Sequence, residues 1–125
     1  MSEIVAFHAA NEGGVPHTLT HFTPKTVLSL QLPNGLYVVH GRVAVMNRDS
    51  DPQNTSGSIK VRSSLVVLDT MTVHLEGHGE MFFRFQCVLK LEEDDTIDLE
   101  VATFVGMWQY ASLIAHTVDA VIPPI

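Results

Sequence analysis

The chain has 125 residues, of which 46% are hydrophobic and 17% are charged, with a single cysteine and a formal net charge of −7. This length fits one domain that can bury a core without a disulfide or a metal, and the ordinary apolar fraction excludes a disordered chain. Seven Lys and Arg against fourteen Asp and Glu leave no basic surplus to neutralise phosphates, so we expect no nucleic-acid partner.

The first residues show none of the features of a secretory leader. The segment Met1–His8 lacks a basic flank and an unbroken apolar stretch. No apolar run approaches the roughly 18 residues that cross a bilayer. We therefore expect a soluble protein without membrane insertion. Its localisation stays open, since an extracellular or virion-associated role could use another export route.

In chain order, the sequence predicts an N-terminal arm or edge strand over 1–26 and one main domain over 27–125. In that domain the dominant hydrophobic period is two, which is typical of β-strands. The alternating runs are Val27–Leu32, Gly35–Asn47, Ile59–Leu68, Met71–Leu75, Gly79–Leu91, Thr96–Thr103 and Tyr110–Ile122. The most loop-like stretch is Asp49–Gly57.

No segment carries a 3.6-residue apolar stripe, and β-branched residues fill most of the alternating runs, so we expect little or no helix. Turn residues such as Pro33-Asn34-Gly35 separate the runs. About eight short strands with frequent turns predict an all-β fold, an antiparallel β-sandwich of the jelly-roll type.

The last run, Tyr110–Ile122, is apolar on both faces. Such a strand is either central in a sandwich or buried against another chain. The additional aromatic residues Phe82 and Trp108 fit both interpretations, which stay open here.

Three short motifs resemble the tumour-necrosis-factor-like jelly roll, and within it the complement component 1q-like branch in a lean bacterial or viral form. Leu32–Val39 is similar to the turn before a strand in which a glycine turns and a tyrosine enters the core. Leu91–Leu99 resembles the late acidic turn and strand, with Asp94-Asp95 in place of the usual Gly-Asp. Tyr110–Ala115 is similar to the closing strand.

The resemblance implies a compact homotrimer in which faces of the sandwiches pack around a threefold axis. We expect the chain itself to be one partner, and a glycan or a protein surface to be another. The candidate interface residues are Leu113, Ile114, His116, Val118 and Phe82. A histidine near the axis would occur three times, so His116 is a candidate for a metal site or a pH switch.

Histidine is the enriched reactive residue, with seven in the chain. The pairs His17/His21 and His74/His78 are spaced i, i+4, which on a strand separates them by about 13 Å, too far to share one metal. The chain has no His-x-His motif of the cupin type. A metal assembled from distant histidines, as in a cupin-like metal-dependent enzyme, is kept as an alternative.

Six carboxylates lie between Glu92 and Glu100, a composition that suits calcium but also suits a solvated turn. The candidate metal ligands are therefore Asp94, Asp95 and His116, calcium is the one ion considered, and no other cofactor is expected. Cys87, on an alternating apolar strand, is expected to be a buried hydrophobe.

The segment Trp108-Gln109-Tyr110 is expected in a connection before the last strand, where aromatic rings beside an amide could stack on a sugar. The alternative is that Trp108 closes one end of the sandwich. No nucleophile motif occurs, so we expect no catalysis. The leading hypothesis is a non-catalytic trimeric binding module, lectin-like in its most concrete form. The alternatives are a trimerisation and display domain of a virion, tail fibre or appendage, and the metalloenzyme.

Overall fold

The computed structural model describes residues 5–11 and 16–119, which form nine β-strands and no helix. The strands are β1 Ala6–Asn11, β2 His17–Thr20, β3 Lys25–Leu32, β4 Gly35–Asn47, β5 Gln53–Val61, β6 Val67–Leu75, β7 Glu80–Leu91, β8 Asp95–Thr103 and β9 Val105–Thr117. Among the described residues, no helix has the length and apolar character needed to cross a bilayer.

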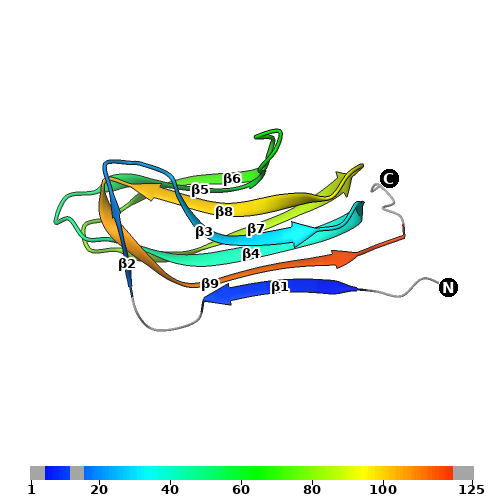
Figure 1. Cartoon of the computed structure of the whole chain (residues 1–125). Helices are drawn as coiled ribbons and strands as arrows, with labels where there is room; N and C mark the ends of the chain where they lie inside the picture. The colour runs from blue at the N-terminus through cyan, green and yellow to red at the C-terminus, as the bar shows by residue number, and fades with distance from the viewer. Residues whose placement is uncertain (1–4, 12–15, 120–125) are drawn as a thin grey trace, which may run out of the picture.

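The strands form two antiparallel sheets that lie one over the other (Figure 1). Sheet A has the order β1-β9-β4-β7, and β2 also pairs with β9. Sheet B has the order β3-β8-β5-β6. The predicted all-β antiparallel sandwich is therefore confirmed, with nine strands where about eight were expected.

The core lies between the sheets and follows from the alternation along each strand. In β4 the inward side chains Tyr37, Val39, Val43 and Val45 are all buried. The Tyr37 hydroxyl donates a hydrogen bond to the Pro33 carbonyl at 2.7 Å, so this large ring can be buried with its polar end satisfied. The predicted limits of β4, Gly35–Asn47, are those observed.

Gly57, in the middle of β5, sets how closely the two sheets approach. A Cβ atom at this position would lie 2.8 Å from the Phe85 ring and 2.9 Å from the Phe83 ring. These two rings of β7 meet edge to face with their centroids 6.4 Å apart. The missing side chain in sheet B therefore makes the space that the aromatic rings of sheet A fill.

The sequence prediction was wrong over residues 49–68. The predicted loop Asp49–Gly57 contains the first half of β5, and the predicted run Ile59–Leu68 is interrupted by a hairpin turn between β5 and β6. The inward positions of β5 begin with Thr55 and Gly57, which are buried without being hydrophobic. Thr55 lies in the core with its Oγ1 atom 3.3 Å from Thr103 Oγ1, so a hydroxyl pair replaces the apolar signal.

The strand β9 begins earlier than predicted and is an inner strand of sheet A, next to β4. It starts at Val105 instead of Tyr110 and ends at Thr117, and the predicted residues 120–122 lie outside the described part of the chain. The stretch 1–26, for which an arm or edge strand was expected, contributes β1 and β2. Both pair with β9 on the side opposite β4, with Phe7 across from Ala115 and His17 across from Trp108.

Candidate functional site

The outer face of sheet B is polar, and its charges are satisfied within the chain. The cross-strand pairs of β5 and β6 on this face are Asn54–His74, Ser56–Thr72 and Ser58–Thr70. Lys60 makes an ion pair of 2.8 Å with Glu100 on the neighbouring strand. This face is of the kind that remains in contact with water.

Asp98 is buried and holds a hydrogen-bond network with the exposed Arg62 and with Ser29 on the same sheet. Its carboxylate accepts two hydrogen bonds from Arg62, at 2.8 and 3.1 Å, and one from the Ser29 hydroxyl at 2.6 Å. Burial alone would raise the pKa of Asp98, but the hydrogen bonds from Arg62 and Ser29 and the nearby cations outweigh it and hold the pKa below its ordinary value. The group is a structural ion pair that is already complete.

The outer face of sheet A is different, because it combines exposed apolar side chains with cations. Across the strands, Val88 lies opposite Val38, and Val38 lies opposite His116. Val88 is 49% exposed, on the edge strand of the sheet. Leu36 and Val38 on the central strand β4 are only half-buried. Apolar side chains on an inner strand that none of the described residues covers mark a surface suited to contact another molecule.

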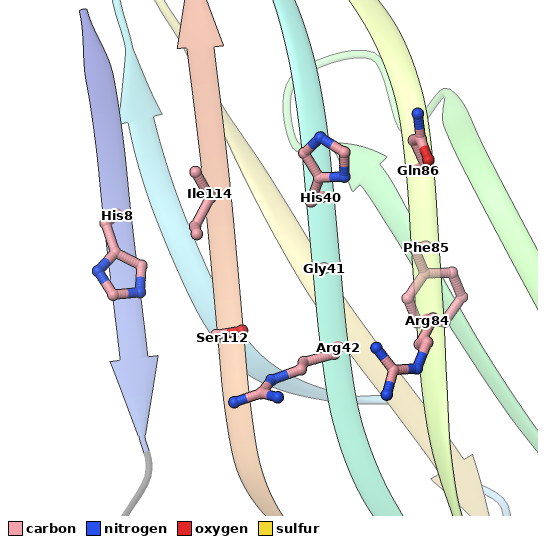
Figure 2. Close-up of a pocket in the computed structure, with 9 residues that line it drawn as sticks. All are labelled: His8, His40, Gly41, Arg42, Arg84, Phe85, Gln86, Ser112 and Ile114. Carbon is pink, nitrogen blue, oxygen red and sulfur yellow. The ribbon is translucent and has the colours of Figure 1, made fainter.

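A groove of about 710 Å³ crosses the middle of this face (Figure 2). It is lined by His8, His40, Gly41, Arg42, Arg84, Phe85, Gln86, Ser112 and Ile114, from strands β1, β4, β7 and β9. Arg42 lies directly opposite Arg84, and the His40 and His116 rings stack with centroids 5.8 Å apart. None of the lining residues that the structure describes is acidic, and Arg42 and Arg84 bring two cations to this groove in a chain of net charge −7.

A second, smaller pocket of about 270 Å³ lies further along the same face, beside a β-bulge in β9. The register places Ala44 opposite Gln109 and Arg42 opposite Ser112, so Tyr110 and Ala111 share one position opposite β4. Tyr110 has a φ of 54°, a left-handed conformation that costs a residue with a Cβ roughly 1–2 kcal/mol. Its ring nonetheless lies on the outer surface and is 37% exposed.

The structure separates the three residues predicted to contact a sugar. Trp108 is 6% exposed, belongs to the hydrophobic core, and stacks on His17 with the ring centroids 4.2 Å apart. It lies inside strand β9 and not in a connection, so the expectation of an available indole ring is corrected. Gln109 and Tyr110 do line the second pocket, together with Ala44, Glu80, Met81 and Phe82.

The predicted metal ligands are each engaged separately. Asp94 accepts a hydrogen bond from the Asn34 amide at 2.9 Å, and His116 stacks on His40. Asp95 accepts a hydrogen bond from the Ser63 hydroxyl, which is the main cause that lowers the pKa of Asp95. Within residues 5–11 and 16–119, no three His, Cys, Asp or Glu side chains are arranged to hold a metal ion.

The five candidate interface residues do not all face the same side of sheet A. Leu113 is fully buried in the core, so its side chain is not available at an interface. Ile114, His116 and Phe82 lie on the outer face of sheet A. Val118 follows the end of β9, where its amide donates a hydrogen bond to the Leu36 carbonyl at 3.0 Å.

The sequence interpretation missed the other residues of this face. Arg42, Arg84, Val38 and Val88 come from two strands that only the sheet register brings together. Their alternation with buried residues was visible in the sequence, but which of the two alternating sets faces solvent depends on how the sheets pair.

No family model and no curated protein matches this chain in sequence. Among solved structures, the fold is that of the tumour-necrosis-factor-like and viral jelly-roll β-sandwiches. The chain is similar to a tumour necrosis factor, Eiger of S. frugiperda, with a TM-score of 0.64 and 10% identity over 98% of this chain and 97% of that one.

It is also similar to chains in two structures of infectious bursal disease virus. The viral particle gives a TM-score of 0.67 with 12% identity over 93% of this chain. The VP2 subviral particle gives 0.64 with 12% identity over 91% of this chain. The chain spans about a third of the length of these viral chains, 31% and 32%. At these identities the likeness defines the fold and leaves the activity to be argued from the site.

Proposed function

We propose that this chain is a non-catalytic jelly-roll module that forms a homotrimer through the outer face of sheet A and thereby presents its loops to the surroundings. The observation that carries the proposal is the contrast between the two outer faces. Sheet B is polar and internally paired, whereas strand β4 of sheet A carries the half-buried side chains Leu36 and Val38 on a face that no other described segment covers. A second copy would remove this apolar surface from water.

Charge supports a cyclic arrangement. A threefold ring uses a heterologous interface, in which one surface of each copy meets a different surface of the next. The cationic groove with Arg42 and Arg84 is one such surface. The turn between β7 and β8, with the exposed residues Glu92, Glu93 and Asp94, offers the complementary acidic surface.

Two further points support assembly and display over catalysis. Two structures of similar fold are those of a viral particle and of a VP2 subviral particle. The thiol of Cys87 is half-buried and burial raises its pKa to about 11, so Cys87 is a poor nucleophile near neutral pH. The complement component 1q-like branch and the virion setting stay predictions within this proposal.

Light scattering coupled to gel filtration tests the proposal. We expect a molar mass three times that of the 13.8-kDa chain. Val88→Asp, on the apolar part of the face, is expected to give a folded monomer, because Val88 is exposed in the single chain and the new carboxylate would be desolvated in the trimer. Thr72→Asp, exposed on sheet B, is the matched control and is expected to remain a trimer.

A native chain of monomer mass at micromolar concentration would contradict the proposal. A trimer that Val88→Asp leaves intact would show that the copies meet through another face.

A further inference from the structure

The small pocket beside the bulge in β9 contains residues to which the proposed assembly gives no role. It is lined by Ala44, Glu80, Met81, Phe82, Gln109 and Tyr110. Two aromatic rings, one carboxylate and one amide therefore surround a volume of about 270 Å³. This volume lies just below the roughly 300 Å³ at which pockets for drug-sized ligands begin, so it suits a single ring and not a long chain.

The backbone at Tyr110 is unusual for a residue inside a strand. The other non-glycine residues with positive φ, among those described, are His21, Phe22, Leu65 and His78, and all lie in connections between strands. A bulge with this left-handed geometry ordinarily carries glycine. Tyr110 therefore keeps a strained backbone conformation where a glycine would be unstrained, and its large ring lies at the surface. This combination indicates that the ring has a function.

The polar groups of the pocket are available to a ligand. The side chains of Glu80, Gln109 and Tyr110 make no hydrogen bond or ion pair with any described residue. Other polar side chains of the same molecule, such as Asn47 and Gln53, are fully engaged in hydrogen bonds. A carboxylate accepts hydrogen bonds, and an amide both donates and accepts them.

We propose that this pocket binds a saccharide, with one pyranose ring placed against Tyr110 and Phe82 and its hydroxyl groups bonded to Glu80 and Gln109. The C–H face of a sugar supplies the apolar surface that aromatic rings take up, and neighbouring hydroxyls match a carboxylate and an amide.

A cationic ligand fits less well. The Arg42 guanidinium lies 5.7 Å from the centroid of the Phe82 ring, so a cationic ligand at this ring would be repelled by the positive charge of Arg42.

The site does not depend on trimer formation. Phe82 and Ala44 lie six residues along their strands from Val88 and Val38, which corresponds to about 20 Å. The pocket therefore lies apart from the apolar contact at Val88, although it adjoins the groove that contains Arg42. Val88→Asp, the expected monomer, allows the pocket to be tested without the trimer.

The experiment is a titration of the ¹⁵N-labelled full chain with glucose, galactose, mannose, fucose and N-acetylglucosamine, followed by amide chemical shifts. We expect at least one sugar to shift the amides of Met81, Phe82, Gln109 and Tyr110 with millimolar affinity. Tyr110→Gly is expected to weaken this binding at least tenfold while it keeps or raises the melting temperature, because glycine relieves the strained φ. Glu80→Gln is expected to weaken it severalfold.

Phe104→Ala is the matched control, since Phe104 is an exposed aromatic residue on the turn between β8 and β9 and does not line the pocket, and it is expected to bind as the native chain does. The proposal is overturned by no shift with any of the five sugars, or by shifts that survive in Tyr110→Gly. A stronger response of the same amides to tetramethylammonium than to any sugar would overturn it in favour of a cation site. A large loss of stability in Tyr110→Gly would show that the ring is structural.

Discussion

Asp98 is the most deeply buried acidic side chain that the structure describes, and it makes a clear prediction about pH. Because its pKa is lower in the folded chain than in the unfolded one, the carboxylate contributes stability above the ordinary carboxyl pKa of about 4. That contribution is lost as the pH falls through the lower folded value. Acidification is therefore expected to weaken the link between Arg62 and Ser29 that Asp98 holds together.

Asp98→Asn is expected to reduce the free energy of unfolding by about 2 kcal/mol at neutral pH, because a charged hydrogen-bond acceptor is lost. Urea denaturation at neutral pH and near pH 2 measures the effect, and the difference between the two chains should shrink in acid. An equal difference at both pH values would mean that the ionised carboxylate is not what stabilises this network.

Cys87 gives a second prediction at the scale of one residue. Burial, with the Asp69 carboxylate as a smaller cause, raises the pKa of the Cys87 thiol to about 11. Its thiolate population near neutral pH is then roughly 100-fold below that of an ordinary cysteine. We expect iodoacetamide to alkylate the native chain at least about 100-fold more slowly than the chain in urea, as followed by mass spectrometry. Similar rates in both states would contradict the buried thiol.

At the scale of the elements, Gly57 determines the fit of β5 against β7. Gly57→Ala places a methyl group against the Phe83 and Phe85 rings, at distances that require those rings to move. We expect a loss of about 1–3 kcal/mol of stability in urea denaturation, the usual cost of overpacking a core. Ser58→Ala, the neighbouring residue on the outer side of the strand, is the control and is expected to change little. A neutral Gly57→Ala would show that the sheets can separate at low cost.

The elements also show what the sequence could and could not predict. The limits of β4 could be predicted because the inward residues Tyr37, Val39, Val43 and Val45 are hydrophobic, whereas the first half of β5 was missed because Thr55 and Gly57 occupy its inward positions. Gln109 and Tyr110 were identified as ligand candidates from residue type alone. Their partners Glu80 and Phe82 are about thirty positions away in sequence and join them only through the register of β4. A bulge is a property of two paired strands, so one strand's sequence does not reveal it.

At the scale of the whole molecule, the acidic net charge and the cationic groove have opposite signs. Elsewhere on the described chain, Lys60, Arg62 and Lys90 are each paired with a carboxylate. The asymmetry favours docking of one copy's acidic turn on the next copy's groove, and it should speed association at low salt.

Trimer formation also predicts that apparent stability depends on concentration. Because the trimer is favoured by mass action and the unfolded chain is monomeric, the melting temperature should rise when the native chain is concentrated. Val88→Asp should melt at one temperature whatever its concentration, and Thr72→Asp should behave as the native chain does. Calorimetry at concentrations that span two orders of magnitude measures this. A melting temperature of the native chain that does not change would contradict a trimer in reversible equilibrium.

The position of β9 has a consequence for how the protein is made. This strand lies between β4 and the N-terminal strands β1 and β2, and it forms every backbone pairing that these two strands have within the described chain (Figure 1). During synthesis, residues 6–11 and 17–20 therefore have no partner in sheet A until residues 105–117 have left the ribosome. The strands β1 and β2 emerge before the strand with which they pair, and the apolar residues Phe7 and Leu19 stay exposed until that strand is made. A chain that ends before residue 105 would have no strand β9, so β1 and β2 would be unpaired and β4 would have an open edge. This is the form most exposed to aggregation and to proteolysis.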